Sequence, residues 1–334
     1  VIKQLADSMG AKVLCFDHRK SGLKRVLGFD ASPNTIGELL STEVILAVGF
    51  TAAKSVMRVK LMQAAKNGAK IVLINPEGAE QELAFLHKAV YVKNDLSFLK
   101  ELARALLDLG KTSSAEGFDA FAESLSGVTP GEQAREVAAL YAGAKKAMIL
   151  CQQNPLTADA AALLAEIAAL SGHLNAPRDG ILQLRSKNNS QGLIDLGITA
   201  GGEAMEGVKA LLTFGEDPQA ASVKDLEFLA VCDVHLTDTA RRADVVFPGT
   251  GFACAEGTFT STERRLQPVH AAIDSDVPLL NWQVAGAIAQ VYEVALPYGD
   301  EADLSAALDA ALPVYRNARL GEVTGGVLTC AAPV

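Results

Sequence analysis

Residues 44–75 read VILAVGFTAAKSVMRVKLMQAAKNGAKIVLIN, and this stretch decides the fold class. An unbroken apolar run at Val44–Gly49 is followed by a helix-like segment at Ala52–Asn67 and a second apolar run at Ile71–Asn75. Strands that are apolar along their whole length are typical of parallel sheets covered by helices on both faces. The stretch therefore predicts a β–α–β unit of an α/β fold.

The same alternation of strands and helices continues on both sides of this unit. Further strands are predicted at Ala11–Phe16, Ala89–Val92, Ala147–Cys151, Lys209–Phe214, Leu229–Asp233 and Ala243–Phe247. Helices are predicted at Leu96–Leu109, Glu132–Ala142, Thr157–Leu170 (with Thr157 as N-cap and Gly172 as stop), Pro278–Tyr292 and Asp303–Leu312. The segments Asn175–Gly197 and Thr250–Gln267 are predicted to be irregular, and the first of them divides the chain into two α/β units.

The composition excludes some classes of protein. The chain has 334 residues, which suggests about two domains. A net charge of -9 and only 5% aromatic residues argue against a nucleic-acid binder, because phosphates need clustered cations and bases need stacking partners. No apolar run reaches the roughly 18 residues that span a bilayer, and no signal peptide is evident, so we expect a cytoplasmic protein without a membrane span. The chain opens on what reads as mid-helix, so we expect it to be part of a longer polypeptide.

Metal and nucleotide motifs are sparse. The five cysteines are scattered, and no pair has the C-x-x-C spacing of a four-cysteine cluster, so buried reduced thiols are expected at Cys15, Cys151, Cys232, Cys254 and Cys330. The sequence has no G-x-G-x-x-G after the first strand, no Walker A motif, no G-x-S-x-G and no H-E-x-x-H. Familiar phosphate-binding and hydrolytic sites are therefore not predicted.

Small or polar residues follow several of the predicted strands. In open α/β sheets, ligands bind beyond the carboxyl ends of the strands. The candidates for a binding cleft at these ends are Gly49, Asn75, Gly215, Glu216, Asp217 and Asp233. Polar loops also occupy this edge in sheets that bind nothing, so the pattern leaves both interpretations open.

Three motifs in order along the chain resemble one family. Arg185–Gly192 (RSKNNSQG) is similar to R-G-Q-N-N-x-Q-G, and Lys209–Pro218 (KALLTFGEDP) resembles a strand ending in G-E-N-P. Ala243–Pro248 (ADVVFP) and Glu256–Arg265 (EGTFTSTERR) resemble A-D-V-V-L-P followed by E-G-T-F-T-N-x-E-R-R. Together with the run Gly22–Pro76, they resemble the molybdopterin oxidoreductase superfamily, which includes formate dehydrogenase catalytic subunits and the large iron–sulfur subunit of complex I.

The resemblance implies two Rossmann-like α/β lobes with mostly parallel sheets, of the formate dehydrogenase domains 2–3 type, with the cofactor between them. We expect the first lobe at 16–187, the second at 1–15 plus 188–295, and a C-terminal tail at 296–334. The family's iron–sulfur domain and C-terminal barrel are not expected in this chain. The family motifs add further cleft candidates, namely Asn188, Asn189, Gln191, Glu256 and Thr258.

The resemblance also assigns catalytic positions. Active members hold molybdenum through two pyranopterin guanine dinucleotides and one protein ligand, usually Cys or selenocysteine. Counting back from Gly28 places Cys15 at the metal-ligand position, where a soft thiolate suits the metal. Arg185 falls at the position of the substrate arginine, whose guanidinium would orient an anion. The alternative roles are a buried strand residue for Cys15 and a lobe-bridging ion pair for Arg185.

Several residues depart from the pattern of active members. Phe16 stands where formate dehydrogenases have a proton-accepting His, and Lys187 replaces a Gln. Glu77 replaces the Arg of a D-P-R turn that helps to hold a guanine dinucleotide. A carboxylate beside a pyrophosphate adds repulsion of about 1–3 kcal/mol in a desolvated site.

The leading hypothesis is therefore a degenerate, structural core module of a multi-subunit, NAD-linked iron–sulfur electron-transfer enzyme, without molybdenum. No cofactor is expected in this chain, while iron–sulfur clusters, FMN and NAD would sit on adjoining domains or on iron–sulfur and flavin partner subunits. One alternative is the catalytic core of a formate dehydrogenase that uses molybdopterin guanine dinucleotide. A second is a non-redox nucleotide-binding module, since a fold alone does not determine function.

Overall fold

The computed structural model describes residues 1–15, 22–51, 55–154, 156–174, 178–199, 201–218, 223–296, 298–312 and 327–328. These residues form two compact units. The central unit comprises the described residues between 22 and 191, together with 262–264. The terminal unit comprises residues 1–15 and the described residues of 192–261 and 265–328. The units change over after residue 191, and the lobe boundary expected after residue 187 stays a prediction. None of the described helices has the length and apolar character that crossing a bilayer requires.

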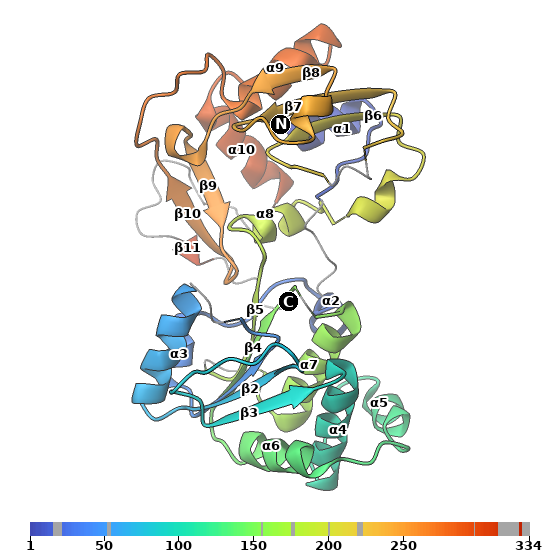
Figure 1. Ribbon diagram of the computed structural model, residues 1–334, viewed down its shortest axis with the longest axis vertical. Helices are drawn as coiled ribbons and strands as arrows, with labels where there is room; N and C mark the ends of the chain where they lie inside the picture. The colour runs from blue at the N-terminus through green and yellow to red at the C-terminus, as the bar shows by residue number, and fades with distance from the viewer. Residues whose placement is uncertain are drawn as a thin grey trace. The chain divides into compact units, whose positions relative to one another are not determined.

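A five-stranded parallel sheet forms the middle of the central unit (Figure 1). Its strands lie in the order β3 (Lys88–Val92), β2 (Lys70–Pro76), β1 (Val44–Val48), β4 (Ala147–Gln152) and β5 (Gly180–Leu184). The chain moves outward from β1 through β2 to β3 and then returns to the other side of β1 with β4. This reversal of direction creates a topological switch point at the carboxyl ends of β1 and β4.

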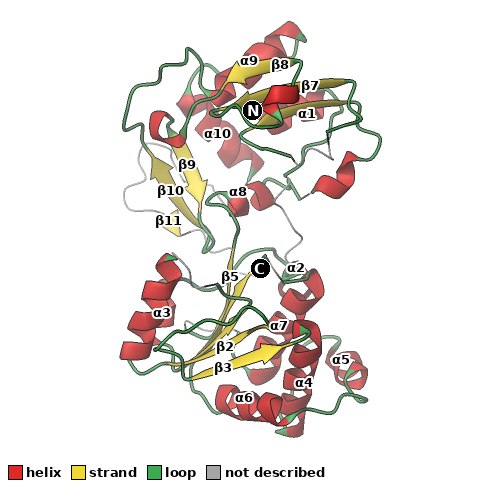
Figure 2. Ribbon diagram, viewed as in Figure 1, coloured by secondary structure: helices red, strands yellow, loops and turns green. Residues whose placement is uncertain are grey.

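Helices cover both faces of this sheet (Figure 2). One face packs against α4 (Asp95–Asp108), α6 (Glu132–Ala142) and α7 (Ala158–Ser171), and the other against α3 (Val56–Lys66) and the short helix η1 (Gly37–Ser41). Side chains of β1 alternate between the two cores: Leu46 faces the first and Ile45 the second, and both are fully buried. A strand buried on both faces must be apolar at every position, as the sequence of β1 predicts.

Several elements begin and end where the sequence predicts. Helix α6 has the predicted bounds. The Thr157 hydroxyl accepts a hydrogen bond from the Ala160 N–H at the start of α7, and Gly172 ends the helix in the left-handed conformation with φ 82. The remaining helices of the central unit are α2 (Lys24–Leu27) and α5 (Phe118–Ser124).

The terminal unit contains a smaller parallel sheet and an antiparallel one. The parallel sheet has the order β6 (Ala210–Phe214), β7 (Phe228–Asp233), β8 (Val245–Pro248), and the antiparallel sheet has the order β11 (Val327–Leu328), β10 (Arg265–Val269), β9 (Gly257–Thr260). The helical elements are α1 (Ile2–Ser8), α8 (Ser190–Asp195), η2 (Gly202–Met205), η4 (Ala240–Arg242), η5 (Phe252–Cys254), α9 (Asn281–Val291) and α10 (Glu301–Ala311). Leu5 of α1 packs with Ala285 and Ala289 of α9 in one of its small cores.

Three predictions of local structure are wrong. The segment Asn175–Gly197 contains β5 and α8, and Thr250–Gln267 contains β9 and β10. In both cases polar residues interrupt the apolar run from which a strand is predicted. Gln183 is buried within β5, and Thr alternates with Phe in β9. The strand expected at Ala11–Phe16 is reduced to a single bridging residue, Leu14, among the described residues 11–15. The fold class itself, α/β with mostly parallel sheets, is confirmed.

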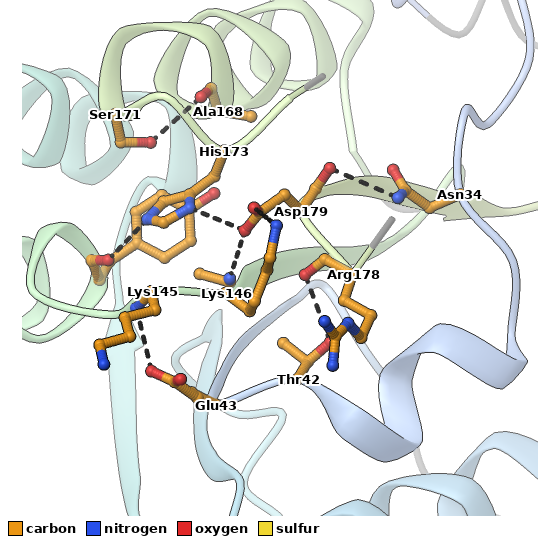
Figure 3. Close-up of polar contacts among 12 residues, drawn as sticks. Asn34, Thr42, Glu43, Lys145, Lys146, Ala168, Ser171, His173, Arg178 and Asp179 are labelled. Atoms are coloured by element: carbon orange, nitrogen blue, oxygen red, sulfur yellow. Dashed lines mark hydrogen bonds and ion pairs between the residues drawn. The ribbon is translucent and has the colours of Figure 1, made fainter. Parts of the chain in front are cut away.

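A buried polar cluster holds together the amino ends of β4 and β5 (Figure 3). The Asp179 carboxylate accepts hydrogen bonds from Lys146 Nζ (2.6 Å), the Ala147 N–H (2.8 Å) and His173 Nδ1 (2.9 Å). On its other side, His173 Nε2 lies 3.1 Å from the carbonyl oxygen of Tyr141, near the end of α6. Both ring nitrogens of His173 therefore lie within hydrogen-bonding distance of oxygen atoms.

The environment of Asp179 makes the stability of this cluster depend on pH. Burial raises the pKa of Asp179, but the hydrogen bonds from Lys146, the Ala147 N–H and His173 outweigh this effect and leave the pKa below its ordinary value. A carboxyl whose pKa is lowered by folding stabilises the protein above its unfolded pKa. This stabilisation is lost as the pH falls through the lower folded value.

We expect Asp179→Asn to lower the free energy of unfolding at pH 7 by about 3 kcal/mol, because Lys146 loses its anion and the hydrogen bonds from the Ala147 N–H and His173 are weakened. The difference should begin to shrink below about pH 4, where the carboxyl of the unfolded chain becomes neutral, and should vanish as the pH falls through the lower pKa of the folded protein. Urea unfolding at pH 7 and pH 3 measures both values. Asp159→Asn is the control: Asp159 pairs with Arg25 on the surface, with the Asp159 side chain 64% exposed, and its loss should cost less than about 1 kcal/mol. Equal losses for the two variants would contradict the assignment.

Candidate functional site

The turn after β1 lies at the switch point, where an α/β sheet binds its ligand. Three successive backbone N–H groups of this turn donate within the protein. Gly49 donates to the carbonyl oxygen of Ile74 (2.9 Å), Phe50 to Asn75 Oδ1 (3.0 Å) and Thr51 to Gln152 Oε1 (3.1 Å). Because Gln152 ends β4, its side chain spans the switch point. Phosphate groups bind such turns through free N–H donors, and these three are already in use.

The predicted cleft residue Asn75 closes this turn from both sides. Its side chain is buried, accepts from the Phe50 N–H and donates from Nδ2 to the Phe50 carbonyl oxygen (3.0 Å). Gln81 Nε2 donates to the same carbonyl oxygen (2.6 Å). Gly49 has φ 61, a conformation that favours glycine, and so lets the chain turn here. Gly49 and Asn75 are therefore brought together, as a closed turn.

Arg185 follows β5, and its side chain is 1% exposed. Its Nη2 donates to the carboxylate of Asp30 (2.9 Å) and to the Asp30 carbonyl oxygen (3.0 Å). Its Nη1 donates to Gln183 Oε1 (2.9 Å) and its Nε to Gln191 Oε1 (3.2 Å). Gln191 also donates to the Asp30 carbonyl oxygen (2.9 Å). Four of the five guanidinium N–H groups thus have partners inside the central unit.

Two residues of the EGTFTSTERR stretch complete this network, although the sequence assigned them no role. The Thr262 hydroxyl accepts from the Arg185 N–H (2.8 Å) and donates to the Gln183 carbonyl oxygen (3.1 Å). The Glu263 carboxylate accepts from the Ile36 N–H (2.6 Å).

Cys15 lies in the terminal unit and is buried. Its Sγ lies 3.8 Å from Glu216 Oε1, close enough for the thiol to donate. A thiolate at this position would face the Glu216 carboxylate, and two neighbouring negative charges repel each other. Cys15 and the predicted cleft residue Glu216 are therefore neighbours in the terminal unit.

The other predicted cleft residues are dispersed within their units. Hydrogen bonds from Thr239 lower the pKa of Asp217, and Asp233 accepts from the His235 N–H (2.8 Å). Gly215 has φ 61 and turns the chain after β6. The exposed or partly exposed candidates are Asn188, Asn189, Glu256 and Thr258. Of the other cysteines, Cys151 on β4 is inert, because burial raises the pKa of its thiol to about 12, and Cys330 lies outside the described residues.

Residues 1–290 match the family model described as molybdopterin oxidoreductase. The chain belongs to the molybdopterin oxidoreductase family. This membership confirms the family expected from the RSKNNSQG, KALLTFGEDP and EGTFTSTERR stretches. The cofactor of active members of this family is molybdopterin.

Similar sequences include formate dehydrogenase subunits. The F420-dependent formate dehydrogenase 2 subunit alpha of Methanococcus maripaludis is 27% identical over 339 residues, covering 80% of this chain and 50% of the relative. Formate dehydrogenase H of Escherichia coli is 26% identical over 341 residues, covering 80% of this chain and 48% of the relative. The NADPH-Fe(3+) oxidoreductase subunit alpha of Geobacter sulfurreducens is 25% identical, covering 75% and 37%. The chain spans about half the length of the formate dehydrogenase relatives.

A solved structure has the same fold. It is a chain of the formyltransferase/hydrolase complex (FhcABCD) from Methylorubrum extorquens, crystallised with methylofuran. The TM-score is 0.62 at 15% sequence identity, and the match covers 87% of each chain. The two-unit core of this chain therefore has nearly the same extent as that solved chain.

The described residues do not fit the anionic molybdopterin cofactor well. The N–H groups of the turn after β1 are occupied by side chains, and Arg185 is neutralised by Asp30. The Cys15 thiol donates to the Glu216 carboxylate. We therefore derive no catalytic step through the cofactor.

We expect Arg185→Ala to lower the free energy of unfolding of the central unit by about 3–5 kcal/mol, because the substitution leaves Asp30 partly buried without its cation. Chemical denaturation measures the change. Asp30→Ala added to Arg185→Ala should recover part of the loss, since it removes the uncompensated charge. Arg135→Ala, at an exposed position of α6, is the control and should change stability by less than about 0.5 kcal/mol. If Arg185→Ala behaved like this control, Arg185 would not be held by a structural ion pair.

Proposed function

We propose that this chain is a structural, molybdenum-free core module of a multi-subunit enzyme that acts on one-carbon units at the oxidation level of formate. The observation that carries the proposal is the network around Arg185. A substrate arginine needs free donors that point at an anion, whereas this guanidinium is buried and already paired with Asp30, Gln183 and Gln191. Its donors hold the chain together.

The relatives support the one-carbon setting. Formate dehydrogenase alpha subunits are similar over most of this chain, and the structural neighbour belongs to a formyltransferase/hydrolase complex. Formate and the formyl group share one oxidation level, so one scaffold suits an enzyme of either kind. Coverage of 87% of the neighbouring chain supports a core that works as a module beside other subunits.

The NAD-linked electron-transfer complex is a second setting for the same structural role. Its support is the similarity to an NADPH-Fe(3+) oxidoreductase subunit. In that setting the iron–sulfur clusters, FMN and NAD would sit on adjoining domains or on partner subunits. The cytoplasmic location expected from the sequence belongs to the proposal in either setting.

The catalytic alternative is a molybdenum-dependent formate dehydrogenase core. Its support is the retention of Cys15 and Arg185 at the family's metal-ligand and substrate positions. The non-redox nucleotide-binding module is less favoured, because Asn75 and Gln152 occupy the N–H donors that a nucleotide phosphate would use.

Elemental analysis of the intact complex, purified from its native host grown with molybdate, distinguishes the structural from the catalytic role. We expect molybdenum far below one atom per copy of this chain. Cys15→Ala should leave the activity of the complex unchanged, as should the control Cys254→Ala at a partly exposed position of the same unit. Near-stoichiometric molybdenum, together with loss of activity in Cys15→Ala alone, would establish the catalytic role instead.

A further inference from the structure

Helix α3 has an unusual outward face. Its buried side packs Met57, Leu61 and Ala64 against the sheet of the central unit. The opposite side of such a helix normally carries polar residues. On α3 it carries Val56, Val59 and Met62, which are 68%, 45% and 38% exposed. Residues three apart are neighbours on a helix, so these three form one continuous apolar strip, here called the α3 face.

Cations border the α3 face. The charged residues of α3 are Arg58, Lys60 and Lys66, all basic, in a chain of net charge -9. Within the described part of the chain, none of these three side chains forms an ion pair or a hydrogen bond. On α4, by contrast, Arg104 pairs with Asp108. The α3 face therefore combines uncovered apolar surface with uncompensated positive charge.

We propose that the α3 face binds a partner subunit whose contact surface is apolar and bordered by aspartate and glutamate side chains. The inference rests on the proposed role of the chain as a module of a multi-subunit enzyme. Burial of Val56, Val59 and Met62 supplies affinity. The surrounding cations select an acidic rim and speed the encounter. A stable interface takes about 800 Å² from each partner, more than one short helix offers, so the α3 face is one part of a larger contact.

Two other occupants fit the same surface less well. A second copy of this chain that packed α3 against α3 across a two-fold axis would bring cations against cations. A membrane surface is usually bound by longer helices with Trp, Phe or Leu on their apolar side, whereas α3 has 11 residues and presents two valines and a methionine. A protein partner with complementary charge matches both the apolar and the basic parts of the face.

Oxidation of methionine tests whether the face is covered. Met62 and Met9 are 38% and 46% exposed, so dilute hydrogen peroxide should oxidise both at comparable rates in the isolated full-length chain. In the complex purified from the native host, we expect Met62 to react about fivefold or more slowly, as measured by peptide mass spectrometry. Met9 in the isolated chain reports the oxidant dose. Unchanged reactivity of Met62 in the complex would refute the proposal.

Carbodiimide cross-linking identifies the occupant, because it joins a lysine amine only to a carboxylate in direct contact. We expect Lys60 or Lys66 to be joined to an Asp or Glu of a different subunit, next to apolar residues. Links to another copy of this chain would overturn the proposal. So would protection of Met62 in the isolated chain by anionic phospholipid vesicles, without protection in the complex.

A substitution separates docking from folding. Val59→Asp should reduce recovery of the partner subunit with the tagged chain by about tenfold, because it places a carboxylate opposite the acidic rim. Thermal unfolding of the isolated chain should not change, since Val59 is exposed. Leu109→Asp, at a position 52% exposed after α4 in the same unit, is the matched control and should retain the partner. Retention of the partner subunit by Val59→Asp would refute the proposal.

The molybdenum content of the complex is measured separately, so failure of the proposed function is distinguishable from failure of this contact.

Discussion

Asp30 and Arg185 form an ion pair at the carboxyl end of β5, and much of the central unit is arranged around it. Removing a guanidinium from water is costly unless its N–H groups find acceptors. Here the acceptors are the Asp30 carboxylate and carbonyl and the side-chain oxygens of Gln183 and Gln191. The RSKNNSQG segment, β5 and the chain around residue 30 are thereby held in one arrangement. A free arginine could bind a substrate in this place, whereas four N–H groups of this one bind acceptors within the central unit.

The same physical constraint applies at the switch point after β1. Backbone N–H groups at a strand end need acceptors, which either a ligand or the protein can provide. In this chain Asn75 and Gln152 provide them, and Gln81 adds a further bond to the same turn. A turn satisfied in this way keeps its shape without a ligand. A phosphate could bind only by displacing hydrogen bonds that are already made.

Much of the fold follows from local patterns in the sequence. The apolar runs predict β1, β2 and β4, and Thr157 and Gly172 predict both ends of α7. The strand β5 was missed because polar partners distant in the chain support it: the Gln183 N–H, for example, donates to Ser32. The strand β9 was missed because Thr alternates with Phe in it, although its partner β10 is the next strand in the chain. The ion pair of Arg185 joins residues 155 positions apart, and a single sequence carries no signal for such a pairing. The motifs therefore indicated the position of Arg185 but not its role.

The interior and the surface of the central unit differ in one respect that bears on function. At the sites where active relatives would bind a cofactor, polar groups satisfy one another. On the outer side of α3, by contrast, apolar side chains and cations lie without partners in the described part of the chain. A protein that binds a small anionic ligand needs the opposite distribution. It needs free hydrogen-bond donors in an internal pocket and an outer surface without uncovered apolar patches. The distribution found here suits a module whose internal polar groups are satisfied by hydrogen bonds and whose uncovered surface side chains would be contacted by a neighbouring subunit.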